Sequence, residues 1–197
     1  MLKVGLTGGI GSGKSEVSKF FNTWNAFIFD ADKEAKNIID NNEIAQQEII
    51  KEFGSDVINA DKIIDKQKLA RIAFQDDFHQ LQLNSIIHPY VFKRIDEIFD
   101  KIKLEDNYKI FIVDAALIYE SGADTHMDYV IVVTSLLRYR TERVMSRGNI
   151  TREDFMKRVA LQWSDEDKES MADFIIQNNS DLKSLEKESK RVLGALL

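Results

Sequence analysis

The fold of this chain is decided by residues 8–15, Gly8-Gly9-Ile10-Gly11-Ser12-Gly13-Lys14-Ser15, which fit the pattern G-x-x-x-x-G-K-S/T. An apolar run at residues 2–6 precedes them directly, and residues 16–21 have the spacing of a helix with one apolar face. Glycines let such a loop wrap a phosphate with its N–H groups pointing inward, and the following helix adds its positive N-terminal end. The loop therefore predicts a site for the phosphates of ATP or GTP.

Two side chains of this loop carry charge or metal-binding chemistry. Lys14 is a compact ammonium suited to bridging β- and γ-phosphate oxygens, and the Ser15 hydroxyl is a hard ligand suited to Mg²⁺. The alternative is a glycine-rich turn without a ligand, but the strand before it and the helix after it favour phosphate binding. The expected nucleotide-binding residues of the loop are Gly9, Gly11, Ser12, Gly13, Lys14 and Ser15.

Composition narrows the class of protein. The 197 residues are 44% hydrophobic and 30% charged, which suits one good core with small inserted subdomains. There is no cysteine, so disulfides and thiolate metal sites are excluded, and a cytoplasmic location is expected. The net charge of −6 argues against nucleic acid or an anionic membrane as a partner, and no apolar stretch approaches the length of a membrane span.

One segment departs from this acidic balance. Residues 138–158 hold seven basic and three acidic side chains, a net charge of +4. Arg140, Arg143 and Arg147 are three and four residues apart, which places them on one face of a helix. Such a face could close over a triphosphate as a lid, and the alternative is a solvated helix whose arginines pair with nearby acids.

Five short apolar stretches predict the strands of a parallel sheet covered by helices on both faces. They are residues 3–7, 27–29, 110–113, 129–133 and 174–176. Together with the loop they indicate an α/β fold of the P-loop kinase type. About eighty residues separate the second and third stretches, and their helical periodicity predicts an inserted helical subdomain. Pro89, the only proline, is expected to break or start a helix near His88.

Ligands of open α/β sheets bind at the carboxyl ends of the strands, and carboxylates follow two of the predicted strands. Asp30 and Asp32 follow the second strand, where one of them either caps the next helix or accepts a proton from an acceptor hydroxyl. Asp114 ends the third strand, where it either holds Mg²⁺ through water, as such carboxylates often do in P-loop proteins, or is an ordinary turn residue. Glu120 is either a substrate contact or the polar end of a turn.

These pieces resemble the dephospho-coenzyme A kinase family in order and over nearly the full length. The loop is similar to the family's version even in Thr7-Gly8-Gly9-Ile10, which the general pattern does not require. The other elements of the resemblance are Asp30-Ala31-Asp32, residues 83–89 ending in His88-Pro89, Leu117-Ile118-Tyr119-Glu120, the lid-like set Arg143, Arg147, Thr151-Arg152-Glu153 and Gln162, and Ala172-Asp173-Phe174-Ile175-Ile176-Gln177-Asn178. Glu16 departs from the family's usual threonine, but its backbone N–H can still face phosphate.

The resemblance implies transfer of the ATP γ-phosphoryl group to the ribose 3′-hydroxyl of dephospho-CoA, with Mg²⁺, giving CoA and ADP in the last step of CoA synthesis. It assigns the proton-accepting role to Asp32 and makes Arg143 and Arg147 the lid arginines. Asn178 becomes a candidate for the adenine pocket. His88, Leu117 and Glu120 become candidate substrate contacts, with His88 as a turn cap in the alternative.

The resemblance also divides the chain into regions. Residues 1–32, 108–134 and 170–197 would form the nucleotide-binding core, residues 33–107 a helical subdomain for the CoA substrate, and residues 135–169 the lid. A kinase for another small acceptor on the same fold is the nearest alternative. A GTPase-type switch is disfavoured, because the guanine signature Asn-Lys-x-Asp does not occur in the sequence.

Overall fold

The computed structural model describes all residues, Met1–Leu197, and the chain divides into two compact units. The first, here called the sheet unit, comprises Met1–Asp30 and Glu97–Leu197. The second, the helical unit, is Ala31–Asp96. No helix of either unit combines the length and the apolar character that crossing a membrane requires.

The sheet unit is built on five parallel strands in the order β2-β3-β1-β4-β5. The strands are β1 Leu2–Thr7, β2 Phe27–Asp30, β3 Ile110–Asp114, β4 Tyr129–Thr134 and β5 Phe174–Gln177. All five predicted strands and the predicted fold class are confirmed. In the register of the sheet, Asp114 lies opposite Leu6 on one side and Asp30 on the other. The carboxyl ends of the three strands β1, β2 and β3 therefore meet at one edge.

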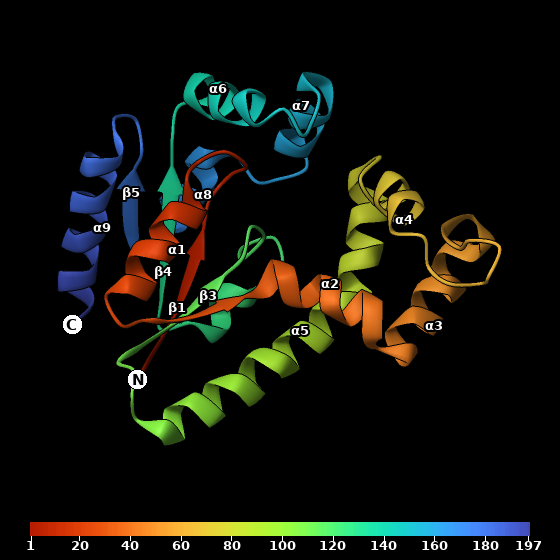
Figure 1. The fold of residues 1–197 in the computed structure, drawn as a ribbon, viewed down its shortest axis with the longest axis horizontal. Helices are drawn as coiled ribbons and strands as arrows, with labels where there is room; N and C mark the ends of the chain where they lie inside the picture. The colour runs from red at the N-terminus through yellow and green to blue at the C-terminus, as the bar shows by residue number, and fades with distance from the viewer. The chain divides into compact units, whose positions relative to one another are not determined.

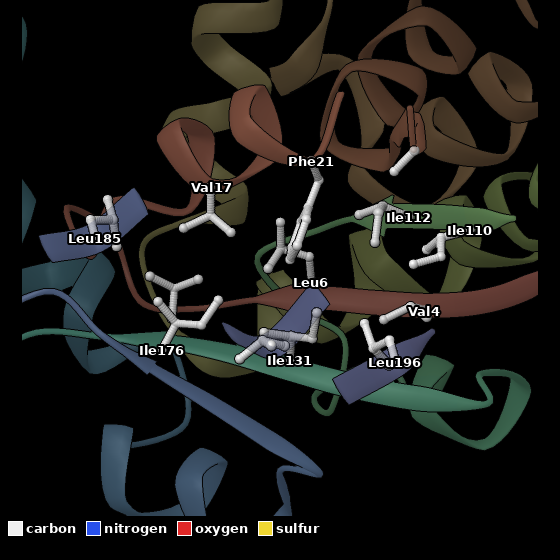
Figure 2. Close-up of a cluster of buried hydrophobic side chains, with 13 residues drawn as sticks. Val4, Leu6, Val17, Phe21, Ile110, Ile112, Ile131, Ile176, Leu185 and Leu196 are labelled. Carbon is white, nitrogen blue, oxygen red and sulfur yellow. The ribbon is translucent and has the colours of Figure 1, made fainter. Parts of the chain in front are cut away.

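One face of the sheet is covered by α1 (Lys14–Thr23) and α9 (Leu182–Leu196), which pack against each other. Strand side chains such as Leu6 and Ile131 meet Phe21 of α1 and Leu185 of α9 in one apolar cluster (Figure 2). Phe21 and Leu6 are fully buried. Burying each such side chain contributes about 1.5–3 kcal/mol, so this cluster anchors α1, and with it the loop that precedes α1.

The segment between β4 and β5 is helical, and its first two helices lie beyond the carboxyl end of β4 (Figure 1), whereas the third contacts β4. It contains α6 (Leu137–Arg147), α7 (Arg152–Ala160) and α8 (Asp165–Met171). Side-chain caps begin two of these helices: Thr151 accepts a hydrogen bond from the Asp154 N–H, and Ser164 accepts one from the Asp167 N–H. These helices occupy most of the segment expected to form a lid.

The helical unit contains α2 (Ala31–Asn41), α3 (Glu43–Phe53), the 3₁₀ turn η1 (Gly54–Val57), α4 (Lys66–Ala73) and much of α5 (Asp77–Glu105). The Asn42 side chain caps α3 by accepting from the Ile44 and Ala45 N–H groups at 3.1 Å. The buried residues of α3, Ala45 and Ile49, are four apart, as the apolar periodicity predicts.

The expectation for Pro89 is wrong, because Pro89 lies inside the 29-residue helix α5. A proline there removes the hydrogen bond to the Ser85 carbonyl and costs about 3 kcal/mol. Ile87, Val91 and Ile95 of the same helix are all at most 5% exposed. Their burial together outweighs the loss at Pro89, which lies on the exposed side of the helix.

Candidate active site

The glycine-rich loop connects the central strand β1 to α1 at the carboxyl edge of the sheet. Gly13 is the residue before α1, and its carbonyl accepts the Glu16 N–H at 3.0 Å. The Ser12 N–H donates to the Gly9 carbonyl at 3.0 Å, which closes the loop on itself. The loop thus presents backbone N–H groups next to a helix N-terminus, the arrangement that binds phosphate.

Lys14 lies with Asp114 and Ser18 at the center of this edge. Its ammonium forms a salt bridge with the Asp114 carboxylate, and the Ser18 hydroxyl donates to the other oxygen of that carboxylate. The side chains of Lys14 and Asp114 are only 15% and 11% exposed. The structure therefore brings together two residues that the sequence placed on different elements.

Ser18 was missed by the sequence analysis. It is four residues after Lys14, one turn along α1, and is buried. Sequence could have indicated it, because a hydroxyl on the buried face of the helix after a phosphate loop needs a polar partner.

The residues at this edge fit a magnesium ion. Ser15 is exposed in the first turn of α1 and offers a hydroxyl oxygen, and Asp114 on the neighbouring strand offers a carboxylate. Mg²⁺ prefers such hard oxygen ligands and takes the rest of its ligands from phosphate and water.

Asp32 is the second residue of α2, which begins at Ala31, directly after β2. Because α2 already includes Ala31, Asp32 lies in its first turn and is not the residue that caps it. A carboxylate is favoured there by the helix dipole. Asp32 is exposed, and only Ala31 separates it from Asp30, the register partner of Asp114.

The three arginines of α6 that the sequence placed on one face have different surroundings. Arg140 is buried and contacts the phosphate loop and Asp165. Arg143 is half-buried, and Arg147, in the last turn of α6, is exposed. The exposure of these three side chains therefore increases along the helix, from Arg140 to Arg147.

Arg143, in the middle of this helix, contacts the residues that directly follow β4 and β5. Its guanidinium donates to the Asn178 carbonyl at 2.8 Å and to the Ser135 hydroxyl at 3.0 Å. Burial and the charge of Arg147 lower the pKa of Arg143, which still leaves a guanidinium charged at neutral pH. The Gly11 carbonyl of the phosphate loop is 3.5 Å away.

Asn178 is buried under the phosphate loop. Its amide donates to the Ser12 carbonyl at 2.7 Å, and its side-chain oxygen accepts from Arg143 at 3.2 Å. The Asn178 side chain thus links β5 to the loop and to α6. Its role at an adenine pocket stays a prediction.

The segment after β3 holds Glu120 inside a buried polar cluster. The ammonium of Lys168, fully buried on α8, lies 2.8 Å from a Glu120 oxygen and donates to the Ala116 carbonyl at 3.2 Å. The Trp163 N–H donates to the same Glu120 oxygen at 2.9 Å. One carboxylate oxygen of Glu120 is therefore committed to the protein, a role that the sequence analysis had not assigned.

Tyr119 and Leu117 lie in the same segment. Tyr119 stacks on Trp163 with ring centroids 5.9 Å apart, and burial, with the charges of Asp173 and Asp124, raises the pKa of Tyr119 to about 12. The Leu117 carbonyl accepts the Ser121 N–H at 3.0 Å and closes a turn. A turn within the segment and a ring contact with Trp163 therefore fix its conformation.

His88 belongs to the helical unit and lies in the interior of α5, so the alternative role as a turn cap is wrong. Its ring stacks on Phe92 at 5.7 Å, and burial lowers its pKa, so the ring is neutral at pH 7. A neutral imidazole can donate one hydrogen bond and accept another.

Comparison with known proteins adds to this geometry. A family model described as dephospho-CoA kinase matches residues 2–184. A dephospho-CoA kinase from Fusobacterium nucleatum is 38% identical over 188 residues, which cover 95% of both proteins. Among solved structures, a dephospho-CoA kinase from Campylobacter jejuni matches with a TM-score of 0.69 and 27% identity, covering 98% of this chain and 96% of that one.

A shikimate kinase from Acinetobacter baumannii, solved in complex with shikimate, also superposes on the chain. Its TM-score is 0.56 at 12% identity, covering 100% of this chain and 93% of that one. At this level of identity, the likeness shows a common kinase fold and nothing about the acceptor.

Proposed function

The chain belongs to the dephospho-CoA kinase family, and on that premise we propose which of its residues carry out the family's reaction. The family catalyses the ATP-dependent phosphorylation of dephospho-CoA, the final step of CoA biosynthesis. The chain is accordingly a kinase with ATP and dephospho-CoA as its substrates.

The phosphate loop binds the triphosphate in this proposal. Backbone N–H groups from Gly9 to Glu16 surround the phosphates, and Lys14 exchanges its salt bridge with Asp114 for the β- and γ-phosphate oxygens. The single observation that carries the assignment is the Lys14–Asp114–Ser18 cluster beside the loop. A lysine that is largely buried beside the loop and paired with a carboxylate supports a phosphate-binding role for Lys14.

Asp32 accepts the proton of the acceptor hydroxyl. The oxygen of the ribose 3′-hydroxyl forms a bond to the γ-phosphorus, the bond from that phosphorus to the β–γ bridging oxygen breaks, and ADP leaves. The hydroxyl proton passes to the Asp32 carboxylate. Support comes from the exposure of Asp32 and from its position just after β2, whose last residue is the register partner of Asp114.

Arg143 and Arg147 would stabilise the negative charge on the transferring phosphoryl group. Arg143 already lies within 3.5 Å of the Gly11 carbonyl in the loop, and Arg147 is exposed at the end of the same helix. Mg²⁺ would be held by Ser15, with Asp114 contributing through water. When bound, it neutralises phosphate charge and orients the triphosphate.

The helical unit is proposed to hold the CoA substrate, with His88 as one contact and Leu117 and Glu120 as contacts from the sheet unit. Asn178 supports the nucleotide site and lies next to its loop. We place the enzyme in the cytoplasm, which fits a sequence without cysteine.

The test is ADP release from ATP and Mg²⁺ with dephospho-CoA, compared with adenosine, AMP, uridine, pantetheine and no acceptor. Turnover confined to dephospho-CoA is expected. Equal turnover with another acceptor would replace the substrate assignment, and a lack of turnover with every acceptor would contradict the function.

A further inference from the structure

The peptide groups at the tip of the phosphate loop are held by two residues that the mechanism above does not use. Arg140 of α6 donates from Nε to the Ile10 carbonyl at 2.8 Å. The side-chain oxygen of Gln162, which follows α7, accepts the Ile10 N–H at 3.0 Å. The backbone carbonyl and the backbone N–H of Ile10 are therefore both hydrogen-bonded to the segment between β4 and β5.

Arg140 is the more unusual of the two residues because its charge is buried. Its side chain is 4% exposed, and its guanidinium forms a salt bridge with Asp165, the first residue of α8, which is 27% exposed. A buried guanidinium is tolerated only where its donors are bonded and its charge is paired. Here the Ile10 carbonyl and the Asp165 carboxylate supply those two partners.

The glycines of the loop leave the space that Arg140 occupies. A Cβ atom added at Gly9 would collide with the Arg140 guanidinium. A Cβ atom at Gly11 would lie 2.8 Å from the Arg140 carbonyl oxygen and 2.9 Å from Val144. Two glycines of the motif thus allow α6 to pack directly on the loop, in addition to allowing close approach to phosphate.

The orientation of one peptide group connects this contact to nucleotide binding. The Ile10 carbonyl and the Gly11 N–H belong to the same rigid peptide plane and point in opposite directions. Gly11 has a φ of 83°, and a glycine adopts positive and negative φ almost equally well. The loop sequence alone therefore does not prevent this peptide from flipping, which would turn a carbonyl oxygen toward the phosphates.

We propose that Arg140 is a positioning residue that fixes the Ile10–Gly11 peptide in the orientation that accepts the triphosphate. Asp165 holds the guanidinium in place, and Gln162 fixes the preceding peptide through the Ile10 N–H. The ATP site is then completed from outside its own motif, by residues 130 and more positions away in the sequence. This inference rests on the proposed role of the loop as the ATP site.

The test is direct binding of ATP to Arg140→Met, measured by calorimetry with Mg²⁺ and without acceptor, at a temperature where circular dichroism shows the variant to be folded. We expect the Kd for ATP to rise about tenfold, the effect of losing one hydrogen bond from a charged donor. The KM for dephospho-CoA, measured at saturating ATP, is expected to change less than twofold. A merely structural arginine would lower the melting temperature without this split.

Arg138→Met is the matched control. Arg138 is exposed on the first turn of the same helix, and its guanidinium lies over the Tyr139 ring, 4.7 Å from the ring centroid. We expect its Kd for ATP to stay within twofold of the wild type. If Arg140→Met does not fold, Arg140→Lys decides, because it keeps the charge beside Asp165 but lacks the planar fork that serves the carbonyl and the carboxylate together.

The outcomes separate this inference from the proposed function. Wild-type ATP affinity in the folded Arg140 variant, beside an active wild-type enzyme, overturns the positioning role and leaves the function intact. A wild-type protein that neither binds ATP nor phosphorylates dephospho-CoA overturns both. A selective loss of ATP affinity in the Arg140 variant supports the inference.

Discussion

At the scale of single residues, the proposed base differs in exposure from charged groups that are buried in ion pairs. Asp32 is exposed in the first turn of α2, whereas Arg140 and Lys168 are buried and paired. Exposure lets a carboxylate exchange a proton with a bound substrate. Burial with a partner fixes a charge in one position.

For Asp32→Asn, we expect kcat to fall by roughly 10² to 10⁴, the usual contribution of a positioned base. The Kd for ATP should change less than twofold, since Asp32 is assigned to chemistry and not to nucleotide binding. Steady-state kinetics together with ATP titration would measure both quantities.

Asp40→Asn is the control for this change, because Asp40 lies near the other end of α2 and pairs with Lys66 on the surface. Its kcat should match the wild type. Unchanged turnover in a folded Asp32→Asn variant would rule out the proposed base.

At the scale of elements, α8 is held in place by ion pairs at two of its residues. Asp165 contacts Arg140 of α6, and Lys168 contacts Glu120 in the segment after β3. The two pairs connect this short helix to the phosphate-loop side and to the β3 side of the sheet unit. A helix of seven residues has little stability of its own, so these contacts decide where it lies.

Lys168→Met tests the second pair. Removing the ammonium leaves the Glu120 carboxylate, 12% exposed, without its cationic partner, and we expect a loss of about 3–5 kcal/mol in the free energy of unfolding. The double variant Lys168→Met/Glu120→Gln should recover part of that loss, because the buried Glu120 position then carries no unpaired charge.

Lys157→Met provides a surface pair for comparison, since Lys157 pairs with Glu153 one turn away and both side chains are more than half exposed. Urea titration measures the free energy of unfolding of both lysine variants. For Lys157→Met we expect that free energy to change by less than about 0.5 kcal/mol. Equal effects of the two lysine substitutions would contradict the structural weight given to Lys168.

Pro89→Ala tests why α5 continues through its proline. Alanine would restore the hydrogen bond to the Ser85 carbonyl, and we expect the free energy of unfolding to rise by about 1–3 kcal/mol, reduced by the greater freedom of the unfolded chain. Pro89→Gly should gain about 1 kcal/mol less. A loss of stability in Pro89→Ala would mean that the proline contributes a contact or a bend that α5 needs.

These elements also show which parts of the structure a sequence reveals. The strands and the phosphate loop were predictable, because apolar runs and glycine spacing are local signals. The continuation of α5 past Pro89 was not, because it depends on the burial of Ile87 and Val91, which the local sequence does not show. The sequence placed Arg140 on the face of a lid or of a solvated helix and gave no prediction for Lys168. Only the packing of α6 and α8 shows that both side chains are buried and paired.

At the scale of the whole molecule, the proposed function gives the two compact units different tasks. The sheet unit contains the phosphate loop, Asp114 and the arginines of α6. The helical unit contains Asp32, His88 and the inserted helices α3 and α4. If ATP is bound by the first and the CoA substrate mainly by the second, each ligand should stabilise a different set of backbone hydrogen bonds.

Amide hydrogen exchange, followed by mass spectrometry, measures this division. With ATP and Mg²⁺ alone, we expect slower exchange in residues 8–18 and in α6, and little change in α3 and α4. With dephospho-CoA alone, slower exchange is expected in the helical unit. Arg140→Met serves as the internal control, because its protection by ATP in residues 8–18 should be weakened while its protection by dephospho-CoA is unchanged. If ATP alone protected α3 and α4 as strongly as residues 8–18, the assignment of one ligand to each unit would be wrong, and nucleotide binding would have to involve the inserted helices directly.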